Sequence, residues 1–394
     1  MTLNIPGNTP VIVGVADIID RRKEDGPDPL SFLVKASELS FQDTGISNLH
    51  SYIDAVGVVR FSVDFSTATN QSNFGYSNFP KSLAKKLNIN KDIFELYSGM
   101  GGNAPQVLIQ EVSKRIYNNE VQCALISGGE VLQTMISKLK AGKPLDWEDH
   151  PGGSPEIVGI NDEGFSSDEK KHFMDLPSNV YPIFANALRS EKSQSSKEHL
   201  KECSELFSKF SKVAEKNSNS WFPKYRSPEE IEKVTDSNRL VGFPYTKYLN
   251  SMIRVNMASS MIIMSEKLSK ELNISQKKKI YLHGSCILND IWNVSKRPKL
   301  IESPAIKKCG EEVLSQAQVS MDSISYFDIY SCFPSAVQIA MKELSLNLDD
   351  NRPLTVTGGL PYFGGPGNAY TMFSSSEMVR KLRKNQNKYG MITA

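Results

Sequence analysis

Apolar residues recur along the first third of the chain as short runs that alternate with longer helical patterns. The run VIVGVADII (residues 11–19) predicts a buried strand. Residues 28–44 predict a helix, because Asp stands at the N-cap position, Pro follows it and apolar residues recur at helical spacing. The same rhythm continues to the strand-like run VQCALIS. We therefore expect βαβ units in a mainly parallel sheet.

The pattern changes after about residue 135, where a polar segment leads into long helical stretches. Residues 180–190 and 196–217 both carry apolar side chains at intervals of three and four residues. This spacing is typical of helices with one apolar face. We interpret residues 136–245 as a helical insertion, which we call the loop domain.

Strand–helix alternation resumes after the insertion. The apolar segment NMASSMIIMSEKLSKEL (residues 256–272) predicts a helix. The segments that predict strands are KIYLHGSCI, ISYFDIYS, LTVTGG and YGMITA, and those that predict further helices are SPAIKKCGEEVLSQAQV and FPSAVQIAMKELSL.

Two similar halves on either side of the insertion predict a duplicated α/β body. Residues 1–135 and 246–275 form the first half, and residues 276–394 form the second. Because the sequence stops inside a strand-like run, we expect the second sheet to be incomplete at its C-terminal end.

The stretch VTGGLPYFGGPGNAY (residues 356–370) is rich in glycine and contains two prolines. Glycine is expected where the backbone adopts positive φ or comes very close to a ligand. A flexible surface loop is one interpretation. The stretch also lies between a strand-like and a helical run, and helix N-termini present free N–H groups to ligands. That position favours a loop that lines a site.

Two further strand-to-helix junctions occupy corresponding places in the two halves. They are SGMGGNAPQ (residues 98–106) and YSCFPSAVQ (residues 330–338). Ligands of α/β sheets gather at the carboxyl ends of strands, so both junctions are candidate walls of a pocket.

A dinucleotide fingerprint is also present in the first junction. Gly99, Gly101 and Ala104 fit the pattern G-x-G-x-x-A. This match leaves a nicotinamide-dependent oxidoreductase as a third functional hypothesis. The acidic residue that should follow has only Glu130 as a candidate, and Glu130 is too far along the chain.

Composition narrows the classes of function. The 394 residues are 39% hydrophobic and 23% charged with a net charge of +2, which is ordinary for a globular protein of two domains or one large body. No long basic face suggests nucleic acid. The five cysteines form no CxxC pair and the five histidines are dispersed, so we expect reduced thiols and no metal site. No leader and no run near 18 apolar residues is visible, which predicts a cytoplasmic protein without a membrane span.

Taken together, six segments resemble the thiolase superfamily, in the acetyl-CoA acetyltransferase-like branch close to sterol-carrier and trifunctional-enzyme-like thiolases. They are SGMGGNAPQVLI, CALISGGE, VYPIFANALR, GFPYTKYLNS, FDIYSCFPSAVQ and TGGLPYFGGPGNAY. The resemblance implies a five-layered αβαβα fold with a helical loop domain over the pocket. It also implies lipid metabolism, a coenzyme A thioester as substrate or ligand, and a homodimer or higher oligomer, and it leaves room for a small partner subunit.

The sequence departs from this family at both positions that activate the substrate. The nucleophilic cysteine that opens the first-half helix in thiolases falls on Gly101. The histidine of the family's GHP motif falls on Gly365, within Gly364-Gly365-Pro366. A thiolase needs a thiolate to accept the acyl group and an acid/base to move a proton, and glycine supplies neither.

Two other family positions lie near the C-terminal end. The Asn or His that opens the NEAF or HDCF motif falls on Tyr330, while Phe333 is retained. The second cysteine of the family, in a CxG loop, would lie beyond Ala394.

Three side chains are candidates to replace part of the missing chemistry. Cys332 precedes a helix start, where the helix dipole can lower a thiol pKa, or it is simply a small buried residue. Tyr330 and Tyr370 are candidate proton donors or acceptors, as in thiolase-like retro-aldolases. Aromatic packing or a capping hydrogen bond is the alternative for both.

The candidate substrate-binding residues lie around these three. By resemblance, Asn250 and Ser251 match the segment that lines the pantetheine tunnel. The alternative is that either residue caps the helix predicted for residues 256–272. Backbone N–H groups of Gly101, Gly102 and Gly365 could stabilise an oxyanion. The other residues placed in this set are Asn103, Phe333, Gly364 and Pro366.

By resemblance, the chain is an acyl-CoA-binding thiolase-family protein and formally an acetyl-CoA C-acyltransferase. The missing nucleophile keeps two alternatives open. One is a non-catalytic acyl-CoA-binding protein, and the other is a retro-aldolase with a tyrosine acid/base.

Overall fold

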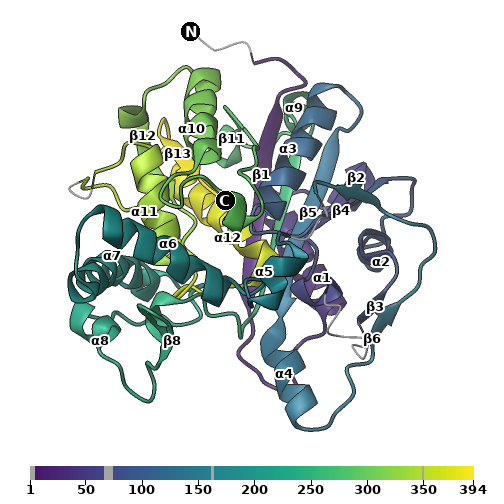
Figure 1. The fold of residues 1–394 in the computed structure, drawn as a ribbon. Coiled ribbons are helices and arrows are strands. Elements are labelled where there is room, and N and C mark those ends of the chain that lie inside the picture. Colours follow the sequence, from purple (N-terminus) through teal and green to yellow (C-terminus); the bar gives the residue numbers. More distant parts are fainter. Residues whose placement is uncertain (1–4, 66–73, 161–163, 348–349) are drawn as a thin grey trace.

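A seven-stranded mixed sheet organises the first half of the chain in the computed structural model, which describes residues 5–65, 74–160, 164–347 and 350–394. The strands follow the order β11-β1-β10-β5-β2-β4-β7 (Figure 1). Their bounds are β1 Pro10–Ile19, β2 Ala55–Val58, β4 Phe94–Ser98, β5 Cys123–Val131, β7 Glu156–Val158, β10 Asn256–Ser265 and β11 Ile280–Tyr281.

The predicted parallel pairing holds on one side of this sheet. β2 runs parallel to both β4 and β5, and β4 runs parallel to β7. On the other side β10 is antiparallel to β1 and to β5, and β11 is antiparallel to β1. The sheet is therefore mixed, because the chain returns to it as β10 after the insertion.

The helix predicted for residues 256–272 is wrong over most of its length. The chain there forms β10 (Asn256–Ser265), in which every residue is buried, and only then the short helix α9 (Glu266–Glu271). An apolar run buried on both faces has no periodicity that separates strand from helix. Two predicted strands also differ: residues 354–359 form no strand, and only Ile280–Tyr281 of KIYLHGSCI is a strand.

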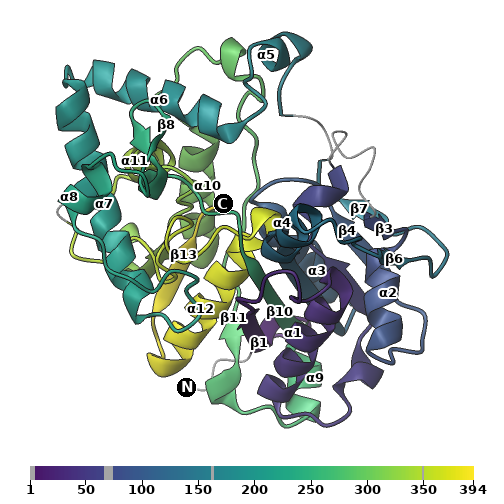
Figure 2. The same cartoon turned by 90° about the horizontal axis from the view of Figure 1, so that it is seen from below.

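The elements stack in five layers, αβαβα, as predicted (Figures 1 and 2). α1 and α2 cover one face of the large sheet, while α3 and α12 lie between that sheet and a parallel pair of strands, β12 and β13. α10 and α11 form the outer layer. The bounds are α1 Pro29–Thr44, α2 Phe79–Lys86, α3 Ala104–Tyr117, α10 Pro304–Ala317, α11 Pro334–Glu343, α12 Tyr370–Lys384, β12 Ile324–Asp328 and β13 Tyr389–Ile392.

The chain between β5 and β10 contributes one strand to the sheet, β7, and then forms the long helices α6 and α7 outside it. α6 packs on α11, and α7 contacts α11 as well (Figure 1). Local capping starts α7, because Ser195 and Glu198 form a capping box. The elements of this region and its surroundings are α4 Leu132–Lys140, α5 Ser167–Lys171, α6 Pro177–Glu191, α7 Ser196–Lys216, α8 Pro228–Glu232, β3 Phe74–Tyr76, β6 Trp147–Asp149, β8 Leu240–Gly242 and β9 Tyr245–Thr246.

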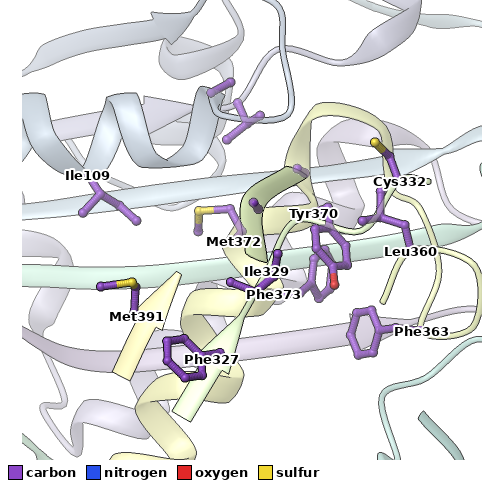
Figure 3. Close-up of a cluster of buried hydrophobic side chains, with 14 of the residues drawn as sticks. Ile109, Phe327, Ile329, Cys332, Leu360, Phe363, Tyr370, Met372, Phe373 and Met391 are labelled. Atoms are coloured by element: carbon purple, nitrogen blue, oxygen red, sulfur yellow. The ribbon is translucent and has the colours of Figure 1, made fainter. Parts of the chain in front are cut away.

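The glycine-rich stretch is part of the core. Residues 355–366 are all buried, so the interpretation as a flexible surface loop is wrong. Figure 3 shows Phe363, Tyr370 and Phe373 in the cluster of buried side chains where this stretch enters α12. Each large apolar side chain buried in this way stabilises the fold by roughly 1.5–3 kcal/mol. No helix of the described ranges is both long and apolar enough to cross a bilayer.

Candidate functional site

The first-half junction and the glycine-rich stretch meet at the N-termini of α3 and α12. The Gly101 N–H donates to Oδ1 of Asn368 at 3.1 Å, and the Thr371 hydroxyl donates to the Gly102 carbonyl at 3.1 Å. Asn368 also donates through Nδ2 to the Arg60 carbonyl at 2.8 Å. The two halves of the chain are thus joined by side-chain-to-backbone hydrogen bonds at the candidate site.

Tyr330 occupies the space that a side chain at residue 102 would need. A Cβ atom on Gly102 would lie well under 3.0 Å from the Tyr330 hydroxyl and ring. The Tyr330 and Tyr370 rings meet nearly at right angles, with centroids 5.7 Å apart. Burial raises the pKa of both phenols above its ordinary value. Both therefore stay protonated at neutral pH and act as hydrogen-bond donors.

Tyr370 is committed to internal hydrogen bonds. Its side chain is fully buried, its hydroxyl lies 2.6 Å from Oγ1 of Thr357, and it donates to Oδ1 of Asp328 at 3.3 Å. Among the described residues, the Tyr330 hydroxyl has no hydrogen-bond partner, and the residue bonds through its backbone N–H to the Thr393 hydroxyl at 2.9 Å. Of the two candidate tyrosines, Tyr330 is therefore the one whose hydroxyl is free to donate to a ligand.

The Cys332 thiol is buried and protonated. Burial raises its pKa to about 12, in spite of hydrogen bonds from the Tyr181 hydroxyl and the Phe333 backbone. Of the two interpretations of Cys332, the raised pKa favours a small buried residue over a thiol activated by the α11 dipole, because desolvation of the thiolate outweighs the dipole. The Phe333 ring stacks on the rings of Tyr181 and Tyr245, with centroid distances of 4.4 and 6.1 Å.

The segment around residue 251 packs against the junction at residues 330–338 and against the glycine-rich stretch. The Ser251 N–H donates to the Cys332 carbonyl at 3.2 Å, and a Cβ atom on Gly365 would collide with the Ser251 hydroxyl. Asn250 instead donates through Nδ2 to the Thr246 carbonyl at 2.7 Å, and the segment whose helix it was expected to cap forms the strand β10. Pro366 and Gly364 lie in the same buried turn.

Most of the predicted oxyanion donors are already engaged. The Gly101 N–H bonds to Asn368, and the Gly365 N–H donates to the Met252 carbonyl at 3.0 Å. Within the described ranges, the Gly102 N–H has no such partner. The neighbouring Asn103 opens α3 without a side-chain cap.

Gly101 has a backbone conformation that excludes a simple return to cysteine. Its φ is +133°, a region that residues with a Cβ atom rarely adopt. A Cβ atom there would also lie 2.6 Å from Oδ1 of Asn103. The missing nucleophile is therefore accompanied by a change in the local backbone.

Asp328, which the sequence did not single out, holds the start of the glycine-rich stretch. Its Oδ2 accepts the Val356 and Thr357 N–H groups at 2.9 and 3.0 Å, and also the hydroxyls of Thr355 and Thr357. Oδ1 accepts the Ser374 hydroxyl at 2.7 Å. The only signal in the sequence is an acidic residue at the end of an apolar strand.

Glu130, at the end of β5, contacts the same stretch from the first half. Its Oε1 accepts the Ser62 N–H at 2.6 Å and would lie 2.5 Å from a Cβ atom on Gly367. Its Oε2 is buried with no hydrogen-bond partner among the described residues. Burial raises the Glu130 pKa to about 7. In the sequence, Glu130 stood out only as a candidate for the acidic residue of the dinucleotide fingerprint.

A cysteine–histidine pair lies one turn apart on α7. Sγ of Cys203 is 3.6 Å from Nε2 of His199, and both side chains are fully buried. Burial raises the pKa of the thiol and lowers the pKa of the imidazole, so both stay neutral. A neutral pair without solvent access is a packing contact and supplies no thiolate.

Comparison with solved structures places the chain in a known superfamily. A monomeric SCP2-thiolase-like protein type 1 from Mycobacterium smegmatis is 28% identical with a TM-score of 0.79, over 98% of this chain and 74% of that one. The chain belongs to the thiolase superfamily.

More distant structures share the fold. Human mitochondrial 3-ketoacyl-CoA thiolase in complex with CoA has a TM-score of 0.65 at 15% identity, over 98% of this chain and 94% of that one. The Ltp2–ChsH2(DUF35) aldolase has a TM-score of 0.66 at 14% identity, over 99% and 95%. Neither the comparison with protein-family models nor that with curated proteins found a match.

Proposed function

We propose that the protein binds an acyl-CoA thioester where the N-termini of α3 and α12 meet the junction at residues 330–338. We also propose that it does not transfer the acyl group through a cysteine. The superfamily fold and the CoA complex of a neighbour support the choice of ligand. The buried glycine turns, which bring backbone close to backbone, support the choice of site.

One observation carries the proposal that acyl transfer is lost. The positions that correspond to the family's cysteine and histidine are Gly101 and Gly365, and the nearby Cys332 thiol is buried with a raised pKa. Acyl transfer requires a thiolate, since the thiol is a poor nucleophile. A site with these residues holds a thioester without attacking it.

The groups left to contact the thioester are donors. The Gly102 N–H and the Tyr330 hydroxyl lie together and could both donate to the thioester carbonyl oxygen. Two donors at one oxygen would polarise the carbonyl and stabilise an enolate, which favours proton transfer or carbon–carbon cleavage over acyl transfer.

Calorimetry with acetyl-CoA, followed by intact mass measurement after incubation, tests this proposal. We expect saturable binding and no acetyl adduct on any cysteine. Gly102→Ala, which would displace Tyr330, should abolish the binding, whereas Gly164→Ala, whose Cβ atom meets nothing closer than 4.0 Å, should leave it unchanged. A stable adduct, or equal binding by both variants, would contradict the proposal.

Retro-aldol cleavage of a β-hydroxyacyl-CoA is the second candidate function. The Tyr330 hydroxyl, which has no hydrogen-bond partner among the described residues, favours it, as does the fold shared with an aldolase. If Tyr330 assists cleavage, Tyr330→Phe should lower the rate of aldehyde release while CoA binding persists. An unchanged rate would remove Tyr330 from the mechanism.

The homodimer and the small partner subunit stay predictions. Among the neighbours, the aldolase is a two-component assembly and the mycobacterial protein is monomeric.

A further inference from the structure

A cleft of about 830 Å³ lies away from the candidate site, at the other end of α12. The C-terminal parts of α7 and α12 and the segment 350–356 form its walls. α12 has 15 residues and is therefore about 22 Å long, beginning with Tyr370 at the candidate site and ending with Lys384 at the cleft. None of the residues proposed to bind acyl-CoA lines the cleft.

Two rows of lysines border the cleft. Those of α7 are spaced at three and four residues and so share one face of the helix, and α12 supplies the second row. The five lysines are Lys209, Lys212, Lys216, Lys381 and Lys384. Within the described ranges, none of them has an ion pair.

The acidic residues of the cleft offset only a small part of this charge, because arginines already pair with them. Asp350 bonds to Arg352, while Asp17 and Glu377 both bond to Arg380 at 2.5 and 2.7 Å. The three carboxylates exceed the two arginines by one negative charge, so the five lysines still leave the cleft with an excess of positive charge. Such a concave, positively lined surface concentrates anions.

The walls and floor of the cleft are not uniformly charged. Leu206, Phe210 and Met341 contribute buried apolar surface. The Asp17 side chain at the floor is fully buried, and its Oδ1 has no hydrogen-bond partner among the described residues. A buried acceptor without a partner costs free energy, which a hydroxyl or amino donor of a ligand would recover.

We infer that this cleft is a second ligand site, for a nucleoside di- or triphosphate. The lysine rows match the phosphate chain, the apolar wall matches the base, and the free Asp17 oxygen matches a hydroxyl or amino donor. The volume is within the range of about 300–1,000 Å³ that small-molecule sites occupy. The inference does not depend on the proposed acyl-CoA function.

Calorimetry on the full chain at low ionic strength tests the inference, with ATP and inorganic tripolyphosphate as probes. We expect one saturable site that binds ATP more tightly than tripolyphosphate. The double substitution Lys212→Glu/Lys381→Glu should weaken ATP binding at least about tenfold, since it reverses charge in both rows. The control Lys197→Glu/Lys388→Glu makes the same change in net charge on exposed residues outside the cleft, and should weaken binding less than about twofold.

Three results would overturn the inference. Equal weakening by the two double variants would show a diffuse charge effect. Equal affinity for ATP and tripolyphosphate would show that the apolar wall and Asp17 do not contact a ligand. Loss of acetyl-CoA binding in the cleft variant would make the cleft part of the acyl-CoA site. Thermal unfolding of each variant checks that it is folded.

Discussion

Two buried carboxylates, one from each half of the chain, contact the glycine-rich stretch and differ in their partners. Asp328, the last residue of β12, accepts hydrogen bonds on both oxygens from the glycine-rich stretch and from α12. Glu130, at the end of β5, accepts one from Ser62 on Oε1 and none on Oε2 within the described residues. Burial raises the pKa of both, to about 7 for Glu130.

This difference in hydrogen bonding makes Asp328 a structural carboxylate, whereas Glu130 can change its protonation state. Donors around Asp328 fix the backbone of residues 355–357 and so the course of the stretch that follows. Glu130 touches the same stretch at Gly367 but holds little of it. Buried polar groups that are fully hydrogen-bonded specify structure, whereas a group with an unsatisfied atom stays sensitive to protonation.

The largest effect is expected at Asp328. Asp328→Asn would turn an amide group toward donors that need an acceptor and leave several of them unsatisfied in the core. We expect a loss of roughly 3–4 kcal/mol in the free energy of unfolding, measured by urea denaturation. The matched change at the other carboxylate, Glu130→Gln, should cost less than half of this at pH 7. If Asp328→Asn lowered the free energy of unfolding no more than Glu130→Gln does, the distinction between the two carboxylates would be contradicted.

Glu130 should make stability depend on pH. Its pKa rises from an ordinary 4.5 in the unfolded chain to about 7 in the folded protein. The folded state therefore holds the proton more tightly, and its stability is full below pH 4.5, declines between pH 4.5 and 7, and is level above. Over that window we expect a loss of up to about 3 kcal/mol.

The control for this prediction is a difference between variants. Subtracting the unfolding free energies of Glu130→Gln from those of the unchanged protein, pH by pH, isolates the carboxyl. The same subtraction for Glu148→Gln removes a carboxylate from an exposed position and controls for the loss of one surface charge. A difference for Glu130 that does not change with pH would show that its carboxyl is not desolvated.

Local signals in the sequence were enough for much of the fold. Asp28 caps α1 through its side chain, as the N-cap pattern predicts, and the strands β1 and β5 follow their apolar runs. Burial on both faces does not by itself explain why β10 was missed, because β5 is also buried throughout and was predicted. β10 contains more Met, Ala and Ser than β-branched residues, and it runs directly into the helix α9, so its sequence favours a helix.

The candidate site was predictable only in part. Glycine at residues 101 and 365 is visible in the sequence, so the loss of the expected side chains could be foreseen. The fit of Tyr330 over Gly102 depends on contact between the two halves, and no local pattern encodes it. The same applies to the hydrogen bonds of Asp328, whose donors come from separate elements.

The smallest effect is expected at Cys332, where burial again decides the protonation state. With a pKa of about 12 the thiol is almost entirely protonated at pH 8, and the residue is only 7% exposed. Iodoacetamide should therefore label the partly exposed Cys286 long before Cys332 and Cys203. Burial and the neighbouring Cys286 thiol also raise the pKa of Cys309 to about 12, so Cys309 should react slowly although it is partly exposed. Mass spectrometry of digests locates the label, and Cys332→Ala should leave any CoA-dependent activity intact because no step uses a thiolate.

Rapid labelling of Cys332 in the folded protein would show an accessible, ionised sulfur. The site would then hold a nucleophile of its own, and burial would not distinguish Cys332 from a reactive cysteine.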